Sequence, residues 1–318
     1  MPHRYPLAVC AIFQDEASYL AEWIEFHRLA GVAHFFLYDN LSEDRPEDVL
    51  DPYVRAGLVT CLPWPRDFTR HAQVHAYDDC LARFGADCRW LALLDVDEFL
   101  FAPGGEALGD VLGEFEDAPG VVVHWQVYGS SGHRRKPEGL VIENFLRRAP
   151  TQWVRNRRLK TVLQPGRTLR ALNPHFALYA DGALAVNENH QACRVDLANR
   201  YSGTRGRLLL QRIRNRLALL ALRLYPRLPL DPYTWSPTSL RHVSVQRLRI
   251  NHYAIKSREE YRIKRQRRRQ PGKPGSGERV HDDLRFRYHD RNDVHDDILL
   301  GWAPRVREAL DRGPLQPL

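Results

Sequence analysis

Apolar and amphipathic segments alternate along the first 100 residues, and this order constrains the fold most. Four short apolar runs indicate buried strands, at residues 7–13, 32–38, 58–64 and 90–94. Helical patterns lie between them: one ends at Gly31, and the others span residues 46–56 and 67–84. Strands that alternate with helices pair in parallel through crossover connections. The alternation therefore predicts an α/β fold with a doubly wound sheet. Further strands are predicted at residues 121–128, 160–164 and 247–251, and a further helix at 139–148.

The fourth strand runs directly into three carboxylates, Asp95, Asp97 and Glu98. In open α/β folds, ligands bind at the carboxyl edge of the sheet, where these side chains are expected to lie. Neighbouring carboxylates repel one another unless a positive group joins them. A hard divalent cation completed by phosphate oxygens is the usual solution. The segment therefore predicts a cation site for a phosphorylated ligand. A polar turn after a buried strand is the alternative for an Asp-x-Asp pair.

Polar residues also follow the first two predicted strands. Gln14-Asp15-Glu16 comes after the first strand, and Asp39-Asn40 comes after the second. Their side chains suit the hydrogen bonds of a nucleoside ring and ribose. A helix cap at Asp15 and a turn at Asp39 are the alternatives. The chain has neither a Gly-x-Gly-x-x-Gly segment nor a phosphate-binding loop, so a metal ion is expected to neutralise a bound diphosphate.

Positive charge is concentrated in one part of the chain. Residues 200–270 hold 19 Lys and Arg against three acidic residues, although the whole chain has a net charge of only +8. Such a block favours an anionic partner: phosphates, a membrane surface or nucleic acid. Within it, residues 208–224 have the pattern of a basic amphipathic helix, and residues 258–269 predict a highly charged one. These helices are expected either to leave their charges solvated or to lie on an anionic membrane.

Cysteine usage and hydropathy point to a cytoplasmic protein. The five cysteines form no Cys-x-x-Cys pair, and no apolar run is long enough for a membrane-spanning helix. The N-terminal residues enter the first strand without the apolar region of a secretory signal. Peripheral contact with the inner face of the membrane is a further hypothesis that rests on the basic block.

Several motifs resemble, in order, those of GT-A glycosyltransferases of the family 92 type, which are also described as a family-2-like group. The matching residues are Ala11-Ile12-Phe13-Gln14-Asp15-Glu16, Tyr19-Leu20-Ala21-Glu22-Trp23, Glu25-Phe26-His27, Gly31-Val32, Leu37-Tyr38-Asp39-Asn40, Ser42, Asp44, Trp90 through Phe99, Tyr128-Gly129-Ser130-Ser131-Gly132-His133, Lys160-Thr161-Val162 and Asn251-His252-Tyr253 with Lys256-Ser257. The most specific of these are Asp-Val-Asp-Glu-Phe at 95–99 and Asn-His-Tyr-x-x-Lys-Ser at 251–257. One departure is Asp15, where such proteins usually have Asn.

The resemblance implies a GT-A-like fold, with a doubly wound mixed sheet and helices on both faces. Its catalytic domain is expected to comprise residues 1–190 and 245–265. A basic helical insertion is expected at 200–240. Residues 266–318 are expected to form a C-terminal tail that packs on the catalytic domain or lies flexibly beside it.

The resemblance also implies metal-dependent transfer of a hexose from a nucleoside diphosphate sugar, with inversion at the anomeric carbon. Asp97, assisted by Asp95 and His252, is expected to hold Mn²⁺ or Mg²⁺ and so to stabilise the leaving diphosphate. A carboxylate must take the proton from the acceptor hydroxyl. Glu143 is the expected base because an apolar helical pattern surrounds it, and Glu138 is a second candidate. An exposed helix position without a catalytic role is the alternative for Glu143.

Donor contacts are expected from Glu16, Asp39 and Asn40, with Lys160 and Lys256 at the diphosphate. The expected donor is a UDP-sugar, and the expected acceptor is a saccharide or a lipid-linked glycan of a bacterial polysaccharide pathway. Two other functions remain open at this stage. The basic block also fits a nucleic-acid-binding protein, although it has no recognised binding motif. The carboxylates also fit a metal-dependent nucleotidyltransferase or hydrolase.

Overall fold

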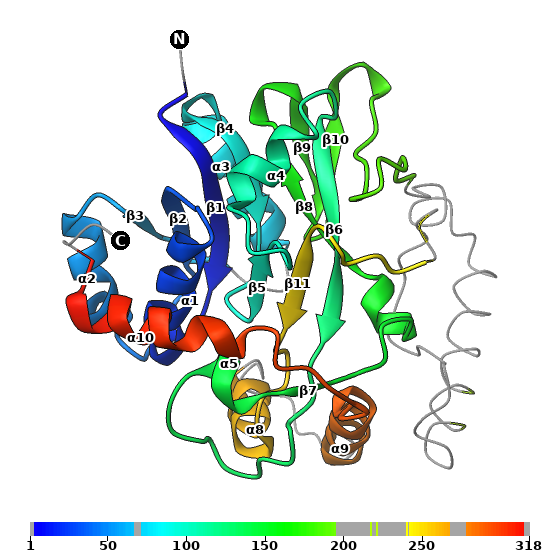
Figure 1. The fold of residues 1–318 in the computed structure, drawn as a ribbon. Helices are drawn as coiled ribbons and strands as arrows, with labels where there is room; N and C mark the ends of the chain where they lie inside the picture. Colours follow the sequence, from blue (N-terminus) through cyan, green and yellow to red (C-terminus); the bar gives the residue numbers. More distant parts are fainter. Residues whose placement is uncertain are drawn as a thin grey trace.

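A computed structural model describes residues 3–66, 71–194, 217, 221, 240, 242–267 and 278–314. Its centre is an eight-stranded sheet with the strand order β3-β2-β1-β4-β8-β6-β11-β5 (Figure 1). The strands of this sheet are β1 (Tyr5–Phe13), β2 (His34–Asp39), β3 (Val59–Pro63), β4 (Cys88–Leu93), β5 (Glu98–Phe101), β6 (Gly120–Val127), β8 (Leu159–Leu163) and β11 (Arg249–His252).

One half of the sheet is parallel and the other half is mixed. β1 pairs in parallel with β2 and β4, and β2 pairs in parallel with β3. β8 runs antiparallel to both of its neighbours, β4 and β6. β11 lies between β6, to which it is parallel, and β5, to which it is antiparallel. The carboxyl ends of β1, β2, β4, β6 and β11 therefore meet at one edge, as the sequence predicted for a doubly wound mixed sheet.

Helices cover both faces of the sheet because successive residues of a strand point to opposite sides. In β1, Leu7, Val9 and Ala11 join one hydrophobic core, whereas Ala8 and Cys10 join the other. The first core also takes residues from α1, α2, α4 and α10, and the second takes residues from α3. The bounds of these helices are α1 (Ala17–Leu29), α2 (Glu47–Arg55), α3 (Ala72–Phe84), α4 (Leu108–Gly113) and α10 (Ala303–Arg312). Helices on both faces are thus confirmed.

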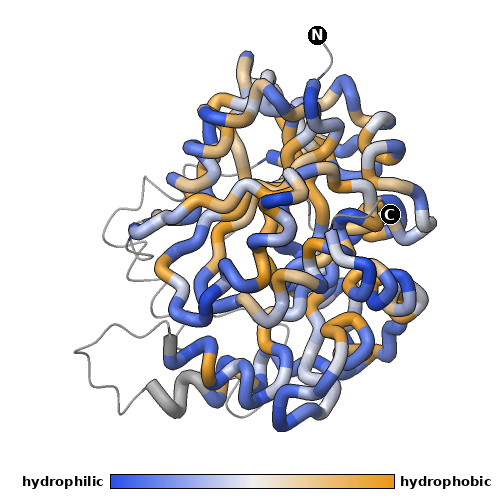
Figure 2. The backbone as a smooth tube through the Cα atoms, turned by 90° about the vertical axis from the view of Figure 1, so that its left-hand side faces the viewer, coloured by the Kyte–Doolittle hydropathy of each residue, from blue (hydrophilic) through white to orange (hydrophobic). Residues whose placement is uncertain are grey.

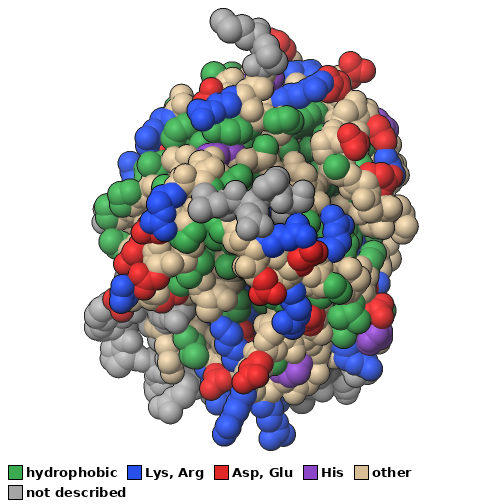
Figure 3. Space-filling view, turned by 60° about the vertical axis from the view of Figure 1, so that its left-hand side comes forward, with side chains coloured by type: hydrophobic (Ala, Val, Ile, Leu, Met, Phe, Trp, Pro, Cys, Tyr) green, Lys and Arg blue, Asp and Glu red, His purple; other side chains and the backbone are tan. Residues whose placement is uncertain are grey.

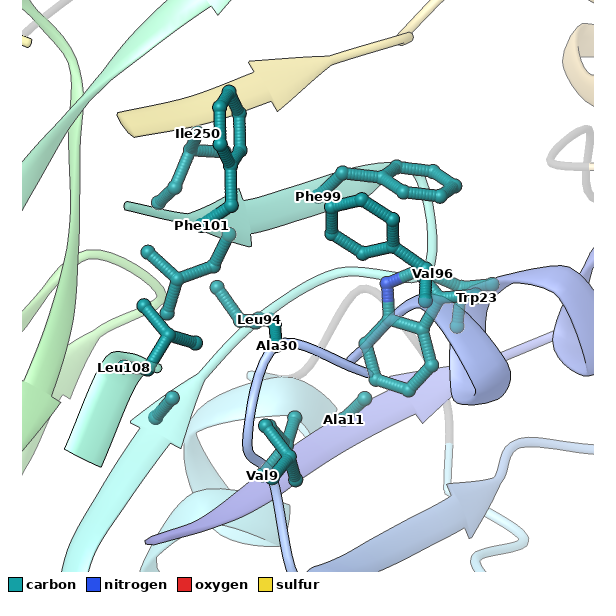
Figure 4. Packing of buried hydrophobic residues seen from close by; sticks show 14 of the residues in the cluster. Val9, Ala11, Trp23, Ala30, Leu94, Val96, Phe99, Phe101, Leu108 and Ile250 are labelled. Carbon is teal, nitrogen blue, oxygen red and sulfur yellow. The ribbon is translucent and has the colours of Figure 1, made fainter. Parts of the chain in front are cut away.

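The first core fixes the turn between β4 and β5. The side chain of Trp23 in α1 belongs to this core together with Val96 and Phe99 (Figure 4), and its indole N–H donates to the carbonyl of Glu98 at 2.7 Å. A displaced Trp23 would leave that buried carbonyl without its donor. Apolar packing and one hydrogen bond from Trp23 of α1 therefore hold this turn in place.

Shorter elements surround the sheet. The colouring of Figure 2 places the hydrophobic residues mainly in the interior of the molecule and the hydrophilic ones mainly on its outer helices and loops. These further elements are α5 (Val141–Asn144), α8 (Arg258–Arg267), α9 (Glu278–His289), β7 (Arg147–Arg148), β9 (Thr168–Asn173), β10 (Phe176–Tyr179), β12 (Val294–His295) and the 3₁₀ turns Gly85–Asp87, Val154–Arg157, Pro165–Arg167, Ala180–Gly182 and Leu300–Trp302.

The predicted helix at 139–148 is wrong except for the single turn of α5. Gly139 has a φ of +88°, and after Asn144 the chain straightens into β7, which pairs with β12. This pairing supplies the backbone hydrogen bonds that a longer helix would otherwise have made. The predicted basic helix at 208–224 lies outside the described residues except for Leu217 and Ala221. No described helix is long and apolar enough to cross a membrane.

Candidate functional site

The turn between β4 and β5 holds the predicted carboxylates. Glu98 is fully buried, and its side chain accepts the backbone N–H of Asp95 at 2.8 Å. In return, the backbone N–H of Glu98 donates to the carbonyl of Asp95. β11 pairs beside this turn, with His252 opposite Glu98. The backbone N–H of Tyr253 then donates to the carbonyl of Asp97 at 2.9 Å. The distant His252 is thereby brought to the carboxylate turn.

A cleft of about 270 Å³ opens at this edge of the sheet. One part of its lining comes from the ends of β1, β4 and β11 and from α3, and the other part comes from α8, α9 and the 3₁₀ turn before β8. Its lining residues are Ile12, Phe13, Gln14, Glu16, Gln73, Asp95, Val96, Asp97, Arg155, His252, Ala254, Ile255, Tyr261, Lys264, Arg265, Arg285 and His289. The cleft thus combines Glu16, Asp95, Asp97 and His252 of the predicted site.

Asp97 contacts both His252 and Lys264. Its Oδ1 lies 3.4 Å from Nε2 of His252, and its Oδ2 accepts from Nζ of Lys264 at 2.7 Å. Lys264 also lies 3.2 Å from Glu16. Burial alone would raise the pKa of Asp97, but Lys264 and His252 hold it well below its usual range. Asp97 is therefore ionised.

His252 is present as a neutral imidazole. Burial lowers its pKa, although Asp97 acts in the opposite direction. Its Nδ1 is buried and has no hydrogen-bond partner among the described atoms. A neutral imidazole beside an ionised carboxylate is a donor pair for a divalent cation.

Asp95 is held by two side chains, Gln73 and Lys160. Its Oδ1 accepts from Gln73 at 2.6 Å and lies 2.9 Å from Nζ of Lys160. Lys160 is fully buried and also lies 3.4 Å from Glu98. Burial alone would lower the pKa of Lys160, but Asp95 and Glu98 hold it well above its usual range. Lys160 therefore positions Asp95 and does not line the cleft, contrary to the predicted diphosphate contact.

Lys256 also lies outside the cleft. Its buried ammonium is 3.8 Å from Glu16 and 3.7 Å from the centre of the Tyr19 ring. Asp39 and Asn40 stand at the same edge of the sheet, and Asp39 is paired in register with Phe13. Asn40 donates to the carbonyls of Trp64 and Arg66 and accordingly shapes the neighbouring loop. Neither Asp39 nor Asn40 is among the lining residues of the cleft.

Glu143, the expected base, lies away from the cleft. Its carboxylate forms an ion pair with Arg307 of α10, at 2.8 and 2.5 Å, and accepts the N–H of Leu140 at 3.2 Å. It therefore caps α5 and ties it to α10. The structure does not bring Glu143 to the other predicted site residues.

A basic wall of the cleft was missed by the sequence analysis. It consists of Arg155, Arg265 and Arg285, with His289 beside them. Burial and the charge of Arg155 lower the pKa of His289 well below its usual value, so this imidazole is neutral. The only sequence signal for these cleft-lining arginines was the charged pattern of residues 258–269, and that pattern indicated a solvated or membrane-bound helix.

The residues present fit a divalent cation with two protein ligands. Asp97 and His252 supply a carboxylate oxygen and an imidazole nitrogen, and the buried Nδ1 of His252 has no hydrogen-bond partner among the described atoms. Within the described part of the chain, no group of three His, Cys, Asp or Glu residues is arranged to hold a metal. Oxygens of a bound diphosphate or of water would have to complete the coordination.

Comparison with known proteins identifies the family. The model of glycosyltransferase family 92 matches residues 5–194, which is more than half of the chain. The chain belongs to glycosyltransferase family 92. A family 92 protein of Oryza sativa subsp. japonica is 30% identical over 174 residues, which cover 54% of this chain and 28% of that protein. A galactan beta-1,4-galactosyltransferase of Arabidopsis thaliana, GALS1, is 30% identical over 128 residues, which cover 36% of this chain and 25% of that protein.

This family 92 chain spans less than a third of the length of these two relatives. Among solved structures, the crystal structure of residues 1–349 of S. aureus TarS in complex with UDP-GlcNAc aligns with a TM-score of 0.34 and 12% identity. The alignment covers 50% of this chain and 45% of that chain.

Proposed function

We infer that this family 92 protein transfers a hexose from a nucleoside diphosphate sugar to a hydroxyl of a saccharide or glycoconjugate. The supporting observation is that the lining of the cleft combines two complementary groups of residues. Asp97 and His252 line it together with Arg155, Arg265 and Arg285. A diphosphate in this cleft would meet positive charge from a cation on Asp97 and from the guanidinium groups.

The nucleoside is proposed to lie over the carboxyl ends of β1 and β2. Phe13 and Gln14 line the cleft there, and Asp39 and Asn40 end the adjacent strand. The diphosphate would then extend past Val96 toward the basic wall. In this arrangement the arginines replace Lys160 and Lys256 as the expected diphosphate ligands.

The chemistry requires a stabilised leaving group and a base. A divalent cation, Mn²⁺ or Mg²⁺, held by Asp97 and His252 would offset the negative charge that develops on the leaving diphosphate. In the transfer, a bond forms between the acceptor oxygen and the anomeric carbon while the bond from that carbon to the diphosphate oxygen breaks. The proton of the acceptor hydroxyl passes to a carboxylate of the cleft. Attack from the side opposite the leaving group inverts the anomeric configuration.

The name of the Arabidopsis relatives supports a specific first choice of substrates. They are galactan beta-1,4-galactosyltransferases, so UDP-galactose and a galactan oligosaccharide are the first donor and acceptor to test. Other UDP-hexoses complete the donor panel.

Calorimetry with UDP, with and without Mn²⁺, tests the proposal together with UDP release from the donor panel. We expect UDP to bind at least about tenfold more tightly with Mn²⁺, because the cation screens its charge. Asp97→Ala should lose this gain and about 100-fold or more of transfer. Asp110→Ala, an exposed position in α4 outside the cleft, is the matched control and should behave like the wild type.

Two results would contradict the proposal. One is no binding of UDP in either condition by the folded protein. The other is normal turnover by Asp97→Ala. Salt-sensitive binding to random DNA or RNA would instead favour the nucleic-acid alternative.

A further inference from the structure

Two further cavities continue from the cleft along the first turn of α1 and the start of α8. The nearer cavity, of about 200 Å³, shares four lining residues with the cleft, namely Glu16, Ala254, Ile255 and Lys264. The farther cavity, of about 380 Å³, shares four lining residues with the nearer one, namely Ser18, Tyr19, Lys136 and Glu260. The two cavities are together called the furrow below. They adjoin each other, and the nearer one adjoins the cleft at Glu16.

The furrow differs from the cleft in charge. Among the described residues, seven acidic ones line it against three lysines: Asp15, Glu16, Glu22, Asp44, Glu138, Glu259 and Glu260 against Lys136, Lys256 and Lys264. The described lining of the cleft has three carboxylates against four Lys and Arg residues. Figure 3 shows acidic and basic side chains intermingled over the lower end of the molecule, where Figure 1 places α8. An anionic ligand therefore fits the cleft but is repelled along the furrow.

The walls of the furrow are tied together before any ligand binds. The Tyr19 ring lies between the ammonium groups of Lys136 and Lys256, at 4.5 and 3.7 Å from its centre, and its hydroxyl donates to Glu260. The backbone N–H of Lys136 donates to Glu259 at 2.8 Å. These contacts join α1, α8 and the loop before α5, so little ordering would be needed on binding.

The far wall of the furrow depends on Glu22. This buried carboxyl accepts the backbone N–H groups of Val141 and Ile142 at 2.8 and 3.1 Å, and so attaches α5 to α1. Its position is set by the same helix that carries Tyr19. The furrow is thus a preformed polar channel and not a gap between loosely packed loops.

We propose that the furrow binds the acceptor as an uncharged glycan chain, with the reacting hydroxyl entering the cleft beside Glu16. This inference rests on the proposed transferase function. Carboxylates and ammonium groups can accept from and donate to sugar hydroxyls, whereas a uronate carboxylate would face six acidic side chains besides Glu22, whose oxygens are taken up by backbone N–H groups. The chemistry therefore favours neutral oligosaccharides over uronate oligosaccharides of the same length.

The test uses the full chain and the variant Ile263→Trp. Ile263 is 41% exposed and lines the nearer cavity, so an indole there should obstruct the furrow but not the cleft. Leu300→Trp is the matched control, because Leu300 is also 41% exposed but lines none of the three cavities. The readouts are the Kd for UDP with Mn²⁺, donor hydrolysis without acceptor, and the acceptor KM for neutral galacto-, gluco- and manno-oligosaccharides and for matched galacturonate oligosaccharides.

We expect Ile263→Trp to raise the acceptor KM at least about tenfold while UDP binding and donor hydrolysis stay as in the wild type. Glu138→Lys, at an exposed carboxylate of the farther cavity, should improve the use of galacturonate acceptors. An unchanged acceptor KM in Ile263→Trp, or a wild-type preference for galacturonate chains, would overturn the inference alone. Failure of the wild type to bind UDP or to hydrolyse any donor would instead overturn the proposed function, and this inference with it.

Discussion

Replacement of Lys160 by methionine tests how the carboxylate turn is built. The Lys160 side chain is only 1% exposed, and its ammonium lies 2.9 Å from Asp95 and 3.4 Å from Glu98. Methionine has a comparable length but no charge. Lys160→Met therefore removes the buried cation while leaving little empty volume.

The expected loss in the free energy of unfolding depends on the two carboxyl groups that the substitution leaves without their cation. Breaking a buried ion pair by removing one partner costs about 3–5 kcal/mol. Two features favour the lower end of this range. Burial raises the pKa of Glu98 well above its usual value, so this group can stay protonated, and the Asp95 side chain is 35% exposed, so water can reach it. We therefore expect a loss of about 3 kcal/mol, or about 4–5 °C in Tm for a chain of this size.

Urea denaturation and scanning calorimetry measure this loss against three further variants. Lys136→Met removes an exposed lysine and should stay within about 0.5 kcal/mol of the wild type. Asp95→Asn, alone and combined with Lys160→Met, completes a double-mutant cycle, in which a coupling energy of about 1 kcal/mol or more is expected for groups in contact. A loss in Lys160→Met as small as that in Lys136→Met, or a coupling energy near zero, would refute the view that Lys160 positions Asp95.

Three further predictions concern separate residues. His252→Ala should reduce transfer less than Asp97→Ala, because water can replace a neutral ligand; equal losses in steady-state kinetics would contradict this. Glu143→Gln should keep nearly wild-type turnover, because its carboxylate pairs with Arg307 outside the cleft, and a loss of about 100-fold would restore it as the base. Glu22, whose pKa burial raises from 4.5 to about 7, binds its proton more tightly in the folded state. The free energy of unfolding should therefore fall by about 3 kcal/mol as pH rises from 4.5 to above 7. Denaturation at pH 5 and pH 8 should show a smaller fall in Glu22→Gln, and equal falls would refute the assignment.

The sequence predicted the parallel half of the sheet well, because each of its strands is a continuous apolar run. β1, β2, β3 and β4 all appear within a few residues of their expected bounds. β5 was missed because it follows the carboxylate turn after only a few residues and joins the sheet through β11, a partner 150 residues away in the chain. Periodicity within a segment carries no information about such pairing.

The residues of the candidate site could also be predicted only in part. Asp95, Asp97 and His252 could be predicted because their motifs are specific, and the structure brings them together. The role of Lys160 could not be predicted, because a lysine in a short strand gives no sign that its ammonium turns toward a buried carboxylate. The basic wall could not be predicted either, because it draws Arg155 and Arg285 from segments with no motif in common.

The insertion of β11 between β6 and β5 governs the order in which the molecule can be assembled. β5 leaves the ribosome directly after β4 but cannot join the sheet until residues 249–252 have been made. Pairing over so long a sequence separation slows folding, and in the interval the edges of β5 and β6 are exposed to other chains. The segment that supplies the imidazole is therefore also the segment that closes the sheet. A chain that stopped at residue 194, the end of the family match, would lack both.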